Sequence, residues 1–275
     1  MIAMHLVPIF RSTFLASAFK IRSSIQSEES AMALGPNNRM GNRAQQMSAD
    51  QAYAAGIDEG LRAYMLKVYN YMCIGLGLTG AVAFATSTSP AMLSAIYGTP
   101  LKWIVMLAPI GLVFFLAARV HTLRASTAQS LFWIYSGLMG LSLAYVFVAY
   151  TGQSVARVFF ITSGAFAGLS LFGYTTKRNL SGMGSFLIMG VIGLVIAMVV
   201  NIFLESSALQ FGISVLGVLI FAGLTAYDTQ KIKSIYAASD GTAVSEKKAI
   251  MGALTLYLDF INMFIFMLHL FGNRE

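Results

Sequence analysis

The chain has 275 residues, of which 57% are hydrophobic and only 11% are charged, and its formal net charge is +7. Soluble domains contain about 25% charged residues, so this composition excludes an ordinary water-soluble protein and favours one solvated by lipid. The 18 Lys and Arg residues are dispersed between apolar segments instead of forming one stripe, which argues against a nucleic-acid-binding protein.

The N-terminal 60 residues differ from the rest of the chain. The extreme N-terminus carries Arg11, Lys20 and Arg22 with no acid before Glu28. This pattern is typical of a basic targeting segment or a membrane-surface segment. An alternative is a true translation start further along, at Met32 or Met40.

Residues from about 25 to 60 are rich in Gly, Asn, Gln and Ser and are predicted to be disordered or loosely helical. We therefore divide the chain into an extension, residues 1–60, and a membrane domain, residues 61–275.

The membrane domain is predicted to be an all-α bundle of about seven spans, because apolar stretches close to the ~20 residues that cross a bilayer recur up to the C-terminus. Short connections with Pro, Gly, Ser or charges separate them. The predicted spans are 67–88, 102–120, 128–150, 155–175, 184–204, 210–231 and 248–271.

Basic residues are more frequent in every second connection, as in the pair Lys177 and Arg178. Because positively charged loops favour the cytoplasmic side, this alternation predicts a cytoplasmic N-terminus and, after an odd number of spans, a C-terminus outside.

Several motifs are interpreted as structural. The glycines of `GLGLTG` (Gly75, Gly77 and Gly80) satisfy a dinucleotide-binding pattern, but they lie within an apolar span, where small residues let helices approach. We predict the same packing role for Gly164 and Gly168 in `GAFAG`.

The single cysteine and the histidines offer no reactive site. Cys73 is predicted to be a small packing residue, and no disulfide framework can be built from it. His121 and His269 are too far apart in sequence to argue a metal site and are predicted to be interfacial.

Two acids lie within the last two predicted spans. Asp228 lies in `GLTAYDTQKIK` and Asp259 in `LYLDFINMF`. An acid in the membrane centre costs about 2.5–3.5 kcal/mol, so each needs a partner or an aqueous cavity. If the sixth span continues past Lys233, the two carboxyl groups can meet on facing helices, share one proton and titrate as a pair. For Asp228, a bond to Lys231 or to the backbone is the alternative; Asn262, one turn beyond Asp259, is predicted to help line a cavity.

At these two segments the sequence resembles the Bax inhibitor-1 family of seven-span membrane proteins, on the strings `AYDTQKIK` and `LYLDFINMF`. The resemblance covers about residues 60 to 275. It implies a pH-sensitive calcium leak closed by a carboxylate pair, Asp228 and Asp259, and by a basic residue near the second span. Arg124, eleven positions before Tyr135, matches that basic residue, and Arg119 is the runner-up.

Two hypotheses of different classes follow. The first is a proton-gated leak for calcium or other cations, in which Asp228 and Asp259 serve as transient calcium ligands and no resident cofactor is required. The second is a regulatory membrane protein that binds a membrane protease or another partner without a pore, as the resemblance to bacterial members implies.

An enzyme is not expected, because no nucleophile with a base, metal ligand set or phosphate loop is present. The expected location is a bacterial inner membrane, or an organellar membrane if the N-terminal segment is a transit peptide.

Overall fold

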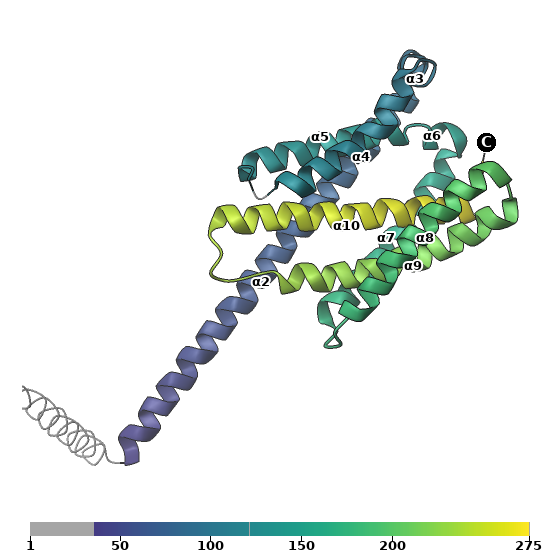
Figure 1. Ribbon diagram of the computed structural model, residues 1–275. Helices are drawn as coiled ribbons and strands as arrows, with labels where there is room; N and C mark the ends of the chain where they lie inside the picture. Colours follow the sequence, from purple (N-terminus) through teal and green to yellow (C-terminus); the bar gives the residue numbers. More distant parts are fainter. Residues whose placement is uncertain (1–35, 121, 275) are drawn as a thin grey trace, which may run out of the picture. The chain divides into compact units, whose positions relative to one another are not determined.

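The computed structural model describes residues 36–120 and 122–274, and these residues are almost entirely helical (Figure 1). Within this part of the chain, seven helical segments are long and apolar enough to cross a membrane, which confirms the predicted all-α architecture. The helices are α2 (Pro36–Ser87), α3 (Pro90–Tyr97), α4 (Leu101–Arg119), α5 (Ala125–Leu143), α6 (Val146–Ala149), α7 (Gly152–Thr175), α8 (Ser181–Leu204), α9 (Ser207–Ser234) and α10 (Thr242–Phe271). The predicted targeting segment and His121 lie outside the described residues.

The chain divides into two units, Met1–Glu59 and Gly60–Glu275. In the first unit, the residues from Pro36 onward are helical, so this part of the region predicted to be disordered or loosely helical belongs to α2. All of the contacts described below lie in the second unit.

The seven spans lie close to their predicted positions, and the first and last begin earlier than predicted, at Asp58 and Thr242. Side chains fix several of the helix starts. Ser89 precedes Pro90 and accepts a hydrogen bond from the Met92 amide, and Ser206 caps α9 in the same way. Such caps satisfy amide groups that have no partner within the helix.

Helix α10 forms the core of the second unit. In its span 67% of the residues are buried inside the protein, compared with 11–33% in the other six. Figure 1 shows α10 between α5 on one side and α9 on the other. Its fully buried side chains include Leu254, Tyr257 and Met263. Asp259, in the middle of α10, is therefore held in the protein interior.

The prediction that Gly164 and Gly168 bring helices together is wrong. A Cβ at either position would meet no atom within 4 Å. The glycines that do lie against a neighbouring helix include Gly140, which faces the Thr79 carbonyl, and Gly217, which faces the Phe266 ring. The sequence does not show which face of a helix meets a neighbouring helix.

The predicted packing role of Gly77, Gly80 and Cys73 is wrong for the same reason. The two glycines have open space where a Cβ would lie, and the Cys73 side chain is exposed. Within `GLGLTG`, only Gly75 packs closely, against Phe132 and Ser136.

Candidate functional site: a buried carboxylate pair

The candidate site lies between α9 and α10, which pack side by side in opposite directions (Figure 1). Helix α9 continues through Lys233 to Ser234, as the meeting of the two acids requires. About six residues of α9 follow Asp228, whereas about 17 residues of α10 precede Asp259, so α10 extends roughly 16 Å further toward the connection. The connecting residues 235–241 can span up to about 23 Å, which is enough to cover this difference.

The side chains of Asp228 and Asp259 lie in hydrogen-bonding contact. Both are buried: Asp228 is 9% exposed and Asp259 is 4% exposed. Lys231, one turn from Asp228 on the same helix, interacts electrostatically with it. The Lys231 side chain itself points outward, with its ammonium 5.8 Å from the centre of the Tyr227 ring. Lys231, the alternative partner predicted for Asp228, thus acts on it only through its charge at a distance. The group in contact with the Asp228 carboxyl is that of Asp259.

One carboxyl oxygen of Asp259 has no hydrogen-bond partner among the described residues. This Oδ2 atom is fully buried. An ionised carboxylate needs several donors when it is removed from water, and a protonated one needs fewer. The surroundings of Asp259 therefore favour a carboxyl group that retains a proton, with Asp228 as the group that shares it.

Polar contacts link α9 to the helices around it. Ser170 of α7 lies 2.9 Å from the Thr229 hydroxyl and 2.6 Å from the Tyr69 hydroxyl, which connects α9 with α7 and α2. On the other side of α10, the Tyr257 hydroxyl lies 2.6 Å from the Thr79 hydroxyl of α2. These contacts hold in place the two helices that carry the acids.

The structure does not bring the other predicted site residues to the pair. Arg124 is exposed at the start of α5, and Arg119 is exposed in the last turn of α4. Among the described residues, neither forms an ion pair with Asp228 or Asp259. The Asn262 side chain donates to the Leu258 carbonyl of its own helix at 2.8 Å.

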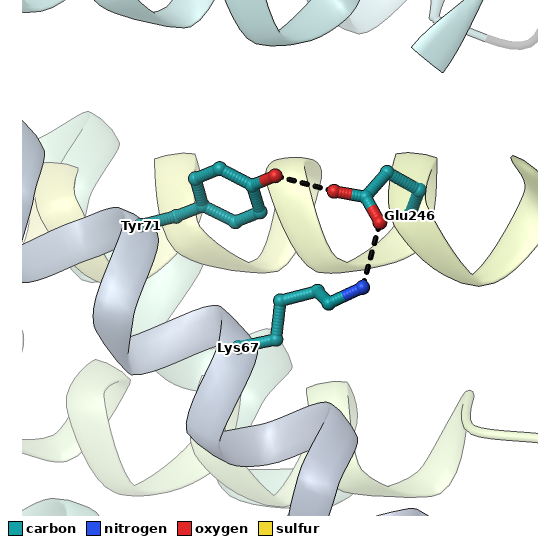
Figure 2. A network of polar contacts seen from close by, with 3 residues as sticks. All are labelled: Lys67, Tyr71 and Glu246. Atoms are coloured by element: carbon teal, nitrogen blue, oxygen red, sulfur yellow. Dashed lines mark hydrogen bonds and ion pairs between the residues drawn. The ribbon is translucent and has the colours of Figure 1, made fainter. Parts of the chain in front are cut away.

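A second polar cluster, which the sequence did not indicate, joins α2 to α10. Figure 2 shows Glu246 accepting a hydrogen bond from the Tyr71 hydroxyl and forming an ion pair with Lys67 at 2.7 Å. Lys67 and Glu246 are 179 residues apart, so only the tertiary structure reveals the pairing.

The arrangement suits transient cation binding better than a permanent metal site. Among the described residues, no group of three His, Cys, Asp or Glu side chains is placed to hold a metal ion. Carboxylate oxygens are the ligands that calcium prefers, but a stable calcium site uses six to eight oxygens. His269, half-buried beside Phe266, is far along α10 from this pair.

The chain is similar to known proteins over the same region. Residues 61–275 match the protein family described as "Inhibitor of apoptosis-promoting Bax1". A protein of Rickettsia prowazekii is 49% identical over 218 residues, which is 79% of this chain and 92% of that protein. The inner membrane protein YbhL of Escherichia coli K12 is 45% identical over 219 residues, 78% of this chain and 94% of YbhL. A protein of Caulobacter vibrioides is 49% identical over 243 residues, 84% of this chain and 97% of its own length. The chain therefore belongs to the Bax inhibitor-1 family of multi-pass membrane proteins.

Proposed function

We propose that the protein is a pH-sensitive leak pathway for calcium ions, gated by Asp228 and Asp259. The observation that carries this proposal is the contact between two buried carboxyl groups on facing helices, one of which has an oxygen without a partner among the described residues. Burying acids in a membrane protein costs free energy, whereas burying apolar side chains does not. A purely structural contact at this place would therefore be more stable with apolar side chains.

The direction of the pH response follows from the burial of the pair. Two ionised carboxylates in contact away from water repel each other strongly, so the closed arrangement is favoured while the pair shares a proton. Raising the pH removes that proton, and repulsion then favours separation of α9 and α10. The separated carboxylates offer oxygen ligands to a passing calcium ion. Calcium flux should therefore rise with pH.

We further propose a bacterial inner membrane as the location, with the N-terminus in the cytoplasm and the C-terminus outside. The similarity to YbhL, an inner membrane protein, supports this location. The distribution of basic residues supports this orientation. An organellar membrane is the alternative if the N-terminal segment is a transit peptide. The proposal assigns no enzymatic reaction.

Calcium influx into proteoliposomes tests the proposal. Purified full-length protein is reconstituted around a calcium-sensitive dye, and the influx is recorded between pH 6 and 8. We expect protein-dependent influx that increases over this range. The alternative function, binding of a membrane protease or another partner without a pore, predicts influx no greater than that of empty vesicles at every pH. That result would exclude the leak.

A further inference from the structure

A long apolar groove runs along the outside of the second unit between α2 and α7. Two cavities lie along it, with volumes of about 680 and 380 Å³, and both are lined by Leu76, Gly77, Phe159 and Phe260. The proposal concerns the larger cavity, which we call the α2–α7 groove. Its lining includes Met72 and Cys73 of α2 and Ala167 of α7.

The α2–α7 groove has the length of one membrane leaflet. Along α2 it extends from Arg62 to Gly77, which at 1.5 Å per residue is about 22 Å. A bilayer with its headgroup regions is ~40–45 Å thick, so one leaflet is about the same length. An occupant with a polar head and chains of leaflet length would fill it.

The lining is apolar along its length and basic at one end. The hydroxyl groups of Tyr69 and Ser170 lie in the lining but are already hydrogen-bonded to each other. Among the described residues, Arg62 is the one charged residue of the lining. Tyr174 also lines the groove. Its backbone carbonyl accepts a hydrogen bond from the Lys233 ammonium at 2.8 Å, and this ammonium lies 4.8 Å from the centre of the Tyr174 ring.

The two cations lie at the same end. Tyr69 of α2 contacts Ser170 of α7, while Gly77 of α2 and Phe159 of α7 line the groove further along, so the two helices line it in opposite directions. Arg62 on α2 and Tyr174 with Lys233 therefore flank one end. A phosphate group there would have two cations within reach, and a hydrocarbon chain beyond it would meet only carbon and sulfur surface and hydroxyl groups already paired.

We propose that the α2–α7 groove binds one anionic phospholipid, with its phosphate at Arg62 and Lys233 and an acyl chain against α2 and α7. A transmembrane helix of a partner, about 10–12 Å across, would fill the apolar part but leave the cations without a counter-charge. Because Phe260 follows Asp259 on α10 and lines the groove, the lipid packs against the helix that carries Asp259.

The headgroup part of the proposal is tested by native mass spectrometry of the full-length protein, released from micelles that contain equal amounts of phosphatidylglycerol and phosphatidylcholine with matched chains. We expect the wild type to retain phosphatidylglycerol preferentially. Arg62→Ala and Lys233→Ala should each lower its retention about fivefold, the effect of one interfacial cation. Lys102→Ala, which removes a cation outside the groove, should leave it unchanged. Wild-type retention in both groove variants would overturn the proposal.

The chain part is tested by filling the groove. Ala167→Phe places a ring in the lining and should reduce retention of both lipids, whereas Ala118→Phe, at an exposed position of α4, should not. If Ala167→Phe instead dissociates an assembly of the protein while lipid retention is unchanged, the groove binds a helix and the proposal is wrong.

A measurement on the wild type avoids any folding defect in these variants. Cys73 is exposed in the lining and is the single cysteine of the chain. Phosphatidylglycerol should slow its alkylation by a lipid-soluble maleimide at least severalfold more than phosphatidylcholine does. Equal rates in the two lipids would contradict the proposal.

Discussion

Gly173 of α7 lies directly against the backbone carbonyl of Ala226 of α9, so that a Cβ at this position would overlap the carbonyl oxygen. One turn before Gly173, Ser170 bonds to Thr229 of α9 at 2.9 Å. The close approach of the two backbones and the hydroxyl contact hold together the segment of α9 that carries Asp228.

This contact predicts that Gly173→Ala destabilises the protein by about 1–3 kcal/mol, because the added methyl group meets backbone that cannot easily move. Thermal unfolding in detergent would measure the loss. Gly164→Ala is the matched control: its Cβ would enter open space, and alanine favours a helix over glycine, so the unfolding temperature should stay the same or rise. A Gly173→Ala variant as stable as the wild type would contradict the close packing.

The carboxylate pair predicts the effect of removing either charge. Asp259→Asn keeps the shape of the side chain but cannot ionise, so it should abolish the rise in calcium influx between pH 6 and 8. Asp228→Asn should do the same, and the double variant should add little, because the two groups act as one unit. Proteoliposome influx measures all three. If both single variants keep the wild-type pH profile, the pair does not gate the protein.

The position of Arg124 predicts a smaller role than that of the acids. Its side chain is exposed and, in the described part of the chain, makes no ion pair with either aspartate. We therefore expect Arg124→Ala to leave the pH profile of calcium influx unchanged. Arg119→Ala, which removes the other candidate arginine, should also leave it unchanged. The resemblance to the family implies instead that removing the basic residue raises the leak at low pH. A raised leak in one variant would identify that arginine as a counter-charge acting in another arrangement of the helices.

The cluster of Lys67, Tyr71 and Glu246 predicts a modest stabilising contact between α2 and α10. Glu246→Gln removes the ion pair but keeps an oxygen that accepts the Tyr71 hydrogen bond. The Lys67 side chain is 44% exposed and that of Glu246 is 20% exposed, so water screens the pair and the loss should be only about 0.5–1 kcal/mol. Lys67→Met should cost a similar amount, and the double variant should cost no more than either single change. Additive losses in thermal unfolding would show that the two residues act separately.

The proposed orientation predicts where reporter fusions are active. Alkaline phosphatase, which is active only outside the cytoplasm, should be inactive when fused before Lys67 or within residues 236–246. A fusion after residue 205, in the connection between α8 and α9, should be active. Activity at either of the first two positions would overturn the orientation with a cytoplasmic N-terminus.

The amino-acid sequence by itself determined the seven spans and the two acids to examine. Both follow from one-dimensional properties: a run of apolar residues long enough to cross a bilayer is visible in any window, and an acid such as Asp259 stands out because no charge lies near it. The strings around the two acids were also specific enough to indicate the family.

Only the tertiary structure decided which groups meet. Gly164 and Gly173 lie in the same apolar helix, α7, yet the first faces open space and the second faces the backbone of α9. Likewise, Glu246 pairs with Lys67 across 179 residues. In a span that is apolar on all sides, hydrophobicity does not mark the face that meets another helix, because lipid is as apolar as the interior. The face is fixed by the fit of side chains from helices far apart in the sequence, and that fit exists only once the bundle has formed.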